Sequence, residues 1–297
     1  MTGPLLAIVA AVLFAGKAVL IRMAYAAAPI NATTLVALRM AFSLPLCLGV
    51  LWWQKDVGPA LTRRDWRTMI WLGFIGYYIA SFLDFWGLQY ISSALERILL
   101  FTYPTLVVLI SAALYGRAVR GREVFALMLT VAGTVVSFAN DLRLTSSSGA
   151  LWKGTALVLG SSLFYAIFLI GSGRNVGRIG SLRFSALSIS IASGFMLGQY
   201  LVLRPAAELF TLPAKIYWLG IALAWFSTGL PIFMTVEAIR RAGASRVSIA
   251  GSIGPIITIW LGHIFLGEAV TAMQLAGAAL VLGGVGLITV SGPGEVS

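Results

Sequence analysis

The stretch PTLVVLISAALYG (104–116) has a counterpart in PIITIWLGHIFLG (255–267), which begins 151 residues later. Each stretch places a glycine 12 residues after a proline, inside a run of apolar residues. Around these stretches the two halves of the chain align without a gap at the same offset, so that Ile98 corresponds to Ile249. The sequence therefore contains two related halves.

The composition indicates a membrane protein. Of the 297 residues, 59% are hydrophobic and 10% are charged, whereas soluble domains carry about 45–50% apolar and about 25% charged residues. Apolar runs long enough to cross a bilayer follow one another along the whole chain, separated by short links. We therefore predict an all-α polytopic membrane protein with ten transmembrane helices. The predicted spans cover approximately residues 3–24, 31–53, 66–89, 94–115, 121–139, 151–172, 182–203, 215–237, 244–266 and 270–290.

The basic residues predict the orientation of these spans, because Lys and Arg are enriched in cytoplasmic links. Thirteen lie in links on the side of the N-terminus and six on the opposite side, so we expect both termini in the cytoplasm. No Lys or Arg precedes the first apolar run, which favours a retained first helix over a cleaved signal peptide. The thirteen are Lys55, Arg63, Arg64, Arg67, Arg117, Arg120, Arg122, Arg174, Arg178, Arg183, Arg240, Arg241 and Arg246; the six are Arg22, Arg97, Arg143, Lys153, Arg204 and Lys215.

The number of spans in each half makes the two halves inverted. Five is odd, so the halves enter the membrane from opposite faces. We expect residues 1–144 to form the first five-helix repeat and residues 145–297 the second. Inverted repeats are typical of secondary transporters, which bind their substrate near the middle of the bilayer.

Two prolines fall at matched depth in this repeat. Pro104 and Pro255 lie about ten residues into their spans, which is roughly midway through a 30 Å core. A proline removes one helical hydrogen bond, and a freed carbonyl inside a membrane needs protein or a watery cavity beside it. We expect the two helices to bend there and to act as gating elements around one cavity, although a single kinked proline is common in membrane helices.

Other residues resemble a known family. The sequence FLGEAVTAMQLAGAALVLGGVGLI (265–288) and the shorter ALRMAF (37–42) are similar to the EamA-type ten-helix branch of the drug/metabolite transporter superfamily. Within that family the chain most resembles bacterial exporters of aromatic and other neutral amino acids. The resemblance implies an inner-membrane carrier that exports metabolites by alternating access, with its cavity lined by both halves.

The chain also departs from the family in two places. The first half reads LYGR (114–117) where the second reads FLGE (265–268), so Glu268 has no counterpart. Small multidrug members of the superfamily use a glutamate in their first helix to exchange protons for cationic drugs. Here the first helix carries Lys17 and no acid, which argues against antiport of cationic drugs.

Charged residues inside the spans are candidates for function, since each costs at least about 2.5–3.5 kcal/mol at a helix centre. Lys17 and Arg39 are predicted roughly 10–12 Å below the outer face. Asp84 lies closer to that face, and Glu96 and Arg97 lie at the outer end of the fourth span. We expect these charges to form one partly buried network whose members offset each other's desolvation.

The individual roles are less closely defined. Lys17 is either a docking point for a substrate carboxylate or a lysine that pairs with Asp84 or extends towards the interface. For Arg39 a bracing role is favoured, because a guanidinium suits neighbouring carbonyls and helix ends. For Asp84 an ion pair is favoured over proton coupling, given the cations expected at similar depth.

Aromatic residues near the span centres form the second group of candidates, because interfacial belts do not account for them. Tyr78, Tyr165 and Trp225 each carry a polar atom that needs a partner or cavity water. We expect these three to enclose the side chain of a neutral amino acid at mid-membrane depth. The predicted substrate site also includes Ser252, Phe101, Tyr103 and Lys17.

The sequence thus predicts a secondary transporter of the bacterial inner membrane that exports small neutral or aromatic amino acids or related metabolites. A broad-specificity drug efflux carrier is the alternative, and a channel or a membrane enzyme is less favoured. An HExxH motif, a second histidine and paired intramembrane aspartates are all missing from the sequence, so we expect no enzymatic activity, metal or cofactor. The expected partners are a small-molecule substrate and membrane lipid but no nucleic acid, with a monomer or a homodimer as the assembly.

Overall fold

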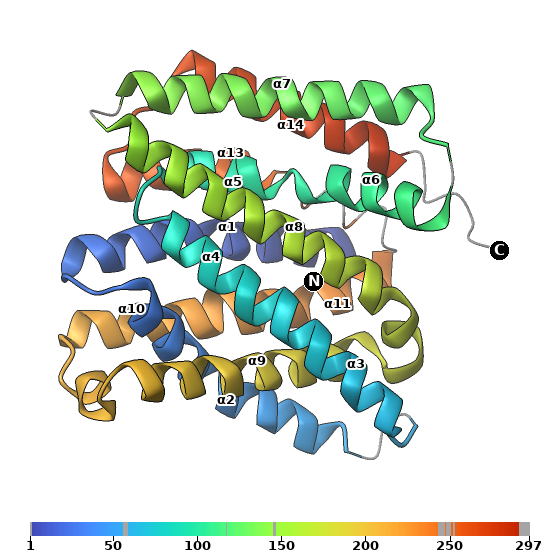
Figure 1. Cartoon of the computed structure of the whole chain (residues 1–297), viewed down its shortest axis with the longest axis vertical. Coiled ribbons are helices and arrows are strands. Elements are labelled where there is room, and N and C mark those ends of the chain that lie inside the picture. The colour runs from blue at the N-terminus through green and yellow to red at the C-terminus, as the bar shows by residue number, and fades with distance from the viewer. Residues whose placement is uncertain are drawn as a thin grey trace.

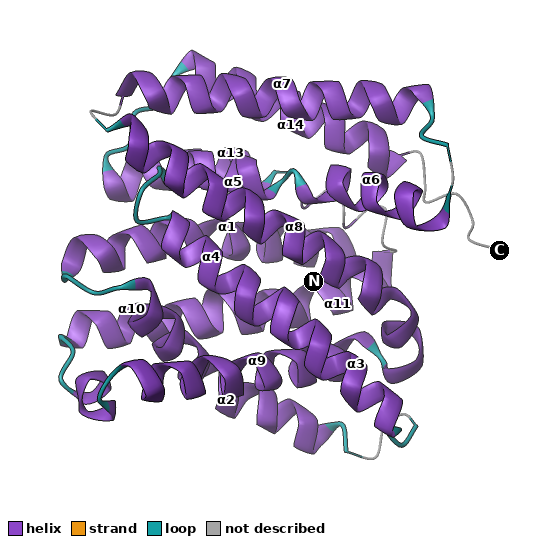
Figure 2. Cartoon of the chain, viewed as in Figure 1, coloured by secondary structure: helices purple, strands orange, loops and turns teal. Residues whose placement is uncertain are grey.

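The computed structural model describes residues 2–55, 59–116, 118–144, 147–242, 247, 251 and 253–290. All the regular structure in these residues is helical, and most of the helices run roughly alongside one another (Figures 1 and 2). The elements are α1 (Gly3–Ala27), α2 (Ala32–Trp53), α3 (Arg63–Gly73), η1 (Phe74–Ile79), α4 (Ala80–Gly87), α5 (Ser93–Leu100), α6 (Tyr103–Tyr115), α7 (Gly121–Leu144), α8 (Ser148–Ile179), α9 (Ser181–Leu203), η2 (Ala206–Phe210), α10 (Ala214–Ala224), η3 (Trp225–Gly229), α11 (Leu230–Ala242), α13 (Gly254–Leu266) and α14 (Ala272–Val290).

The described helices follow the predicted spans. Eight helical segments are long and apolar enough to cross a membrane, and two shorter apolar helices, Gly254–Leu266 and Ala272–Ile288, follow them. Of the predicted ninth span, the structure describes chiefly the second half, as α13. Local sequence sets several helix starts: Asn31 accepts a hydrogen bond from Thr34 N (2.9 Å) at the start of α2, as N-cap residues commonly do.

Three interruptions of the backbone recur at the offset of 151 residues. The π-helical segment η1 begins at Phe74 and η3 begins at Trp225. The helices α6 and α13 both begin just before a proline. Each of these two helices ends on a glycine with positive φ, 65° at Gly116 and 67° at Gly267, a conformation that glycine adopts without steric cost. The repeat seen in the sequence is thus also a repeat of irregular backbone.

The helix contacts follow the same relation. Under the offset, α1 corresponds to α8, α2 to α9, α4 to α11, α6 to α13 and α7 to α14. The pair α1–α11 then corresponds to α8–α4, and α1–α13 corresponds to α8–α6; all four are observed contacts. The pairs α2–α9 and α7–α14 each join a helix to its own counterpart. The fold is two inverted five-helix repeats that pack against each other.

The contact between α7 and α14 depends on glycine. These helices lie together at one end of the molecule (Figure 1). A Cβ atom at Gly133 would lie 2.5 Å from the Gly277 carbonyl oxygen, and one at Gly284 would lie 2.5 Å from the Ala126 carbonyl oxygen. Small residues let membrane helices approach at backbone distance. Gly133 and Gly284 correspond to each other in the repeat, so each repeat places a glycine at this close helix contact.

Candidate functional site

The first interruption of interest separates α5 from α6. The chain turns at Phe101 and Thr102, and Pro104 lies in the first turn of α6. Because proline has no N–H, the Leu100 carbonyl lacks its usual helical donor. The Ser162 hydroxyl on α8 donates to this carbonyl at 3.4 Å and lies 2.9 Å from the Thr102 hydroxyl, which itself donates to Leu99 O. The helix is interrupted just before Pro104, and hydroxyl groups compensate for the freed carbonyl.

The corresponding interruption precedes α13. Ile253 caps this helix and Pro255 lies in its first turn. The Thr258 hydroxyl donates to the Ala15 carbonyl of α1 at 3.0 Å and so ties the start of α13 to the first helix. Ser252, which was predicted to lie beside the substrate, is outside the described residues.

A buried charge cluster lies next to the first interruption. The Lys17 ammonium on α1 is 2.6 Å from Asp84 Oδ2 on α4 and 3.1 Å from Glu96 Oε1 on α5. The Glu96 side chain is fully buried, and the Asp84 side chain is 4% exposed. Of the two roles considered for Lys17, the structure shows the ion pair, and a role in substrate binding stays a prediction.

Arg97 makes no ion pair with this cluster among the described residues. Its guanidinium lies over the Phe101 ring, 5.2 Å from the ring centroid. A Cβ atom at Gly254 would lie 2.9 Å from Arg97 Nη2, so the guanidinium rests against the first residue of α13. The buried Nε atom has no hydrogen-bond partner among the described residues. Arg97 therefore links the two interruptions, which lie far apart in the sequence.

Arg39 also contacts an aromatic ring. Its guanidinium is 5.0 Å from the Phe85 ring centroid, and Nη1 is 3.4 Å from the Thr228 hydroxyl of η3. These contacts join α2, α4 and η3, which fits the predicted bracing role. Of the five charges expected to form one network, the structure thus brings together Lys17, Asp84 and Glu96, while the two arginines lie on aromatic rings.

The predicted aromatic residues separate into groups. Tyr103 and Tyr165 meet edge to face with their ring centroids 5.1 Å apart, and Phe101 lies 6.4 Å from Tyr103. Tyr78 instead packs on Phe74 at 5.1 Å and on Phe195 at 5.9 Å.

Trp225 lies elsewhere again. Its indole N–H donates to the Phe42 carbonyl of α2 at 3.2 Å, and 45% of the residue is exposed. The structure therefore brings Tyr165 together with Tyr103 and Phe101 beside Arg97, whereas Tyr78 and Trp225 have other neighbours.

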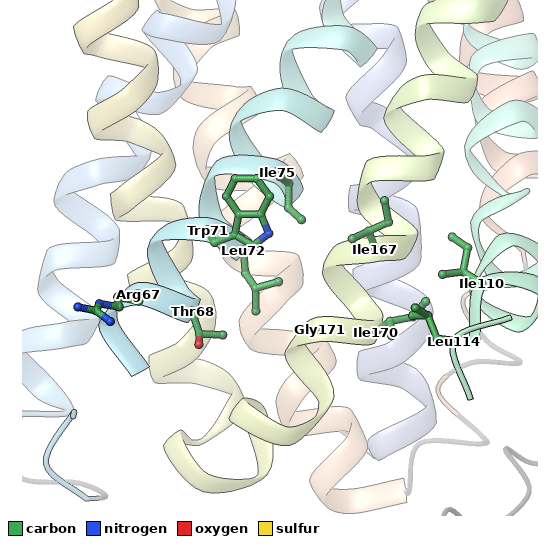
Figure 3. Close-up of a pocket in the computed structure, with 10 residues that line it drawn as sticks. All are labelled: Arg67, Thr68, Trp71, Leu72, Ile75, Ile110, Leu114, Ile167, Ile170 and Gly171. Carbon is green, nitrogen blue, oxygen red and sulfur yellow. The ribbon is translucent and has the colours of Figure 1, made fainter. Parts of the chain in front are cut away.

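A cavity of about 480 Å³ lies between α3, α6 and α8 (Figure 3). Arg67 and Trp71 line it from α3, Ile110 and Leu114 from α6, and Ile167 from α8. It occupies the ends of these spans farther from Asp84 and Glu96, and none of the predicted substrate residues lines it. We therefore place the candidate site at the buried charges and the rings beside Arg97, and not at this cavity.

At the opposite end of the spans, the start of α5 is held by an acidic side chain. Ser93 donates to Glu268 through its backbone N–H at 3.0 Å and through its hydroxyl at 2.6 Å. Arg22 Nε is 3.7 Å from the same carboxylate. Glu268, which has no counterpart in the first repeat, thus joins the α13–α14 link to the start of α5 and the end of α1.

Known proteins resemble this chain along almost its full length. An uncharacterized transporter YcbK of Bacillus subtilis (strain 168) is 29% identical over 285 residues, covering 93% of this chain and 88% of that protein. An aromatic amino acid exporter YddG of Ancylobacter novellus is 25% identical over 244 residues, covering 79% of this chain and 80% of that protein. A solved protein structure with 17% identity superposes with a TM-score of 0.67 over 97% of this chain and 96% of its own.

The family comparison covers both repeats. The sequence model of the EamA-like transporter family matches residues 1–139 and again residues 152–290. The second match begins 151 residues after the first, the same offset that relates the interruptions of the backbone. The chain therefore belongs to the EamA-like transporter family, and it is a membrane transporter.

Proposed function

We propose that this transporter exports small neutral amino acids, aromatic ones included, across a bacterial inner membrane by alternating access. The observation that carries the proposal is the position of Arg97, whose guanidinium lies against the start of α13 and over Phe101. A named aromatic amino acid exporter among the relatives supports the choice of substrate class.

Arg97 is the proposed partner of the substrate carboxylate. A guanidinium forms paired, charge-assisted hydrogen bonds with a carboxylate. The helices α6 and α13 both begin near it, and the start of a helix carries a partial positive charge. Secondary transporters use the starts of such half-helices to hold anionic groups of their substrates. Lys17 is a less favoured partner, because two carboxylates already surround it.

The substrate side chain is proposed to lie against Phe101, Tyr103 and Tyr165. Aromatic contacts contribute about 0.5–1.5 kcal/mol beyond buried area, which permits binding and release. An apolar pocket distinguishes a methylene by only about 1–3 kcal/mol, so we expect a range of neutral amino acids. The predicted contributions of Tyr78, Trp225 and Ser252 stay proposals, and the first two would act from outside this group of rings.

The described conformation fits access from the cytoplasm. With the orientation predicted from the basic residues, the cavity between α3, α6 and α8 opens on the cytoplasmic side. At the outer end, Glu268 holds the start of α5 through Ser93. Release of this contact and closure of the cavity would expose Arg97 to the outer face.

The test is exchange of labelled phenylalanine and methionine in liposomes that contain only this protein. Replacing Arg97 by Met removes charge-assisted hydrogen bonds worth about 1.5–3 kcal/mol each, and the loss of even one lowers affinity by roughly 10- to 150-fold. Arg97→Lys keeps the charge but not the paired geometry, so it should recover only part of that loss. Arg143→Met, at an exposed arginine, is the matched control.

Two results would overturn the proposal. Wild-type protein that exchanges lipophilic cations but not amino acids would identify a drug efflux carrier. Unchanged affinity in a folded Arg97→Met variant would remove this residue from substrate binding. Folding of each variant is checked by size-exclusion chromatography in detergent before reconstitution.

A further inference from the structure

We propose that Asp84 and Glu96 share one transferable proton beside Lys17, and that the transporter exchanges this proton for its substrate. The inference rests on the proposed function for the identity of the substrate, but the proton site itself rests on the buried charge cluster.

The cluster contains more acceptors than donors. The Lys17 ammonium lies 2.6 Å from Asp84 Oδ2 and hydrogen-bonds it. The same ammonium is 3.1 Å from Glu96 Oε1 but does not meet hydrogen-bond geometry there. Asp84 Oδ1 and both Glu96 oxygens have no hydrogen-bond partner among the described residues. One lysine therefore faces two carboxyl groups that together leave three buried oxygens unpartnered.

The neighbouring cations are engaged elsewhere. Arg97 lies over Phe101, and Arg39 lies over Phe85. Arg22 is 3.7 Å from Glu268 and donates to a backbone carbonyl at 3.4 Å. From α8, Lys153 donates to the Tyr90 hydroxyl at 3.0 Å. None of these four cations makes an ion pair with Asp84 or Glu96 in the described part of the chain.

The remaining titratable groups around the cluster add no positive charge. Tyr25 of α1 donates its hydroxyl to the Phe85 carbonyl at 2.7 Å. Asp141 of α7 accepts a hydrogen bond from Asn140 at 3.3 Å. These groups are neutral or acidic, so among the described residues the two buried carboxyl groups have an ion pair with Lys17 alone.

The crowding of two carboxyl groups around one ammonium favours a bound proton. Two carboxylates at one buried site cannot both remain ionised without strong repulsion, so one of them holds a proton. A carboxyl group that carries this proton also gains a donor, which can serve one of the unpartnered acceptors beside it. The favoured state of the cluster is a lysine cation, one carboxylate and one neutral carboxyl group.

The position of Glu96 explains how the proton is coupled to the substrate. It directly precedes Arg97, the proposed carboxylate partner, in α5. The ammonium of a zwitterionic substrate bound at Arg97 favours an ionised Glu96. Binding of the substrate therefore disfavours binding of the proton, and the reverse. Binding on the cytoplasmic side releases the proton from a carboxyl oxygen to water, and substrate release outside lets that oxygen take a proton from water again.

The test measures proton release directly. Phenylalanine is added to purified protein in weakly buffered detergent solution with a pH indicator dye. Wild-type protein should release a proton on binding, whereas Glu96→Gln, which imitates the neutral carboxyl group, should release none. Glu208→Gln, at an acid of η2 whose side chain is 43% exposed, is the matched control and should behave as wild type.

A second measurement needs no substrate. Infrared difference spectra of the protein in lipid, recorded between acidic and alkaline buffer, should contain a protonated carboxyl band that Glu96→Gln removes or shifts and Glu208→Gln retains. Absence of that band in wild-type protein, or an identical band in Glu96→Gln, overturns the proton site. Phenylalanine exchange without proton release overturns the coupling and leaves the proposed function standing. If phenylalanine is not exchanged at all, the proposed function fails and the infrared band alone decides the proton site.

Discussion

The glycine contact between α7 and α14 permits a sharp test of the fold. An added Cβ atom at Gly284 would lie 2.5 Å from both the Ala126 carbonyl oxygen and the Thr130 hydroxyl oxygen. Ordinary van der Waals contact begins near 3.4 Å, so the Gly284→Ala side chain must push the two helices apart by roughly 1 Å. A gap of this size removes a quarter to a half of the dispersion attraction between facing atoms. Overpacking of this kind costs about 1–3 kcal/mol.

The same helix contains a matched control. A Cβ atom at Gly286 would meet nothing within 4 Å. Gly286→Ala therefore gains helix propensity, about 0.5–1 kcal/mol, without any steric cost. The contrast between two Gly→Ala changes in one helix isolates the packing contribution.

The assay is thermal unfolding in detergent, followed by tryptophan fluorescence. At about 2–4 °C per kcal/mol for chains of 150–250 residues, Gly284→Ala should lower the midpoint by roughly 2–12 °C, while Gly286→Ala should not lower it. Because the repeat relates the two positions, Gly133→Ala should cost about as much as Gly284→Ala. Equal midpoints for Gly284→Ala and Gly286→Ala would refute the close approach of α7 and α14.

Two further predictions concern topology and gating. In a Cys47→Ser background, single cysteines that replace Arg120 and Thr211 should react with a membrane-impermeant label from opposite faces of the membrane. Labelling of both from the same face would contradict the inverted repeat. Pro104→Ala returns an N–H donor to the Leu100 carbonyl and straightens the junction of α5 and α6. The variant should still fold, but its rate of phenylalanine transport should fall. An unchanged transport rate would contradict the gating role of Pro104.

Local sequence determined much of the architecture. The apolar runs specify ten spans because each span must satisfy its own backbone in lipid. The offset of 151 residues follows from proline and glycine, which keep their positions where other apolar residues interchange freely. The helix break at Pro104 was also predictable, since proline cannot donate a hydrogen bond wherever it stands.

Part of the charge cluster was predictable as well. A lysine buried in a membrane needs a counterion, and Asp84 was the acid expected at a similar depth to Lys17. The sequence did not reveal that Glu96 turns towards the same ammonium while its neighbour Arg97 lies over the Phe101 ring. On a helix, adjacent residues point in different directions, and only the packing of α5 decides what each one meets.

The tertiary structure alone decided the remaining contacts. Ser162 compensates the carbonyl freed by Pro104, and Arg97 rests against Gly254. The positions of Tyr78 and Trp225 away from Tyr165 were equally hidden. Each of these relations depends on which helices cross and at what height, and helices distant in the sequence meet only after the two repeats have packed together. A sequence records which groups need partners, and the packed fold determines which partners they find.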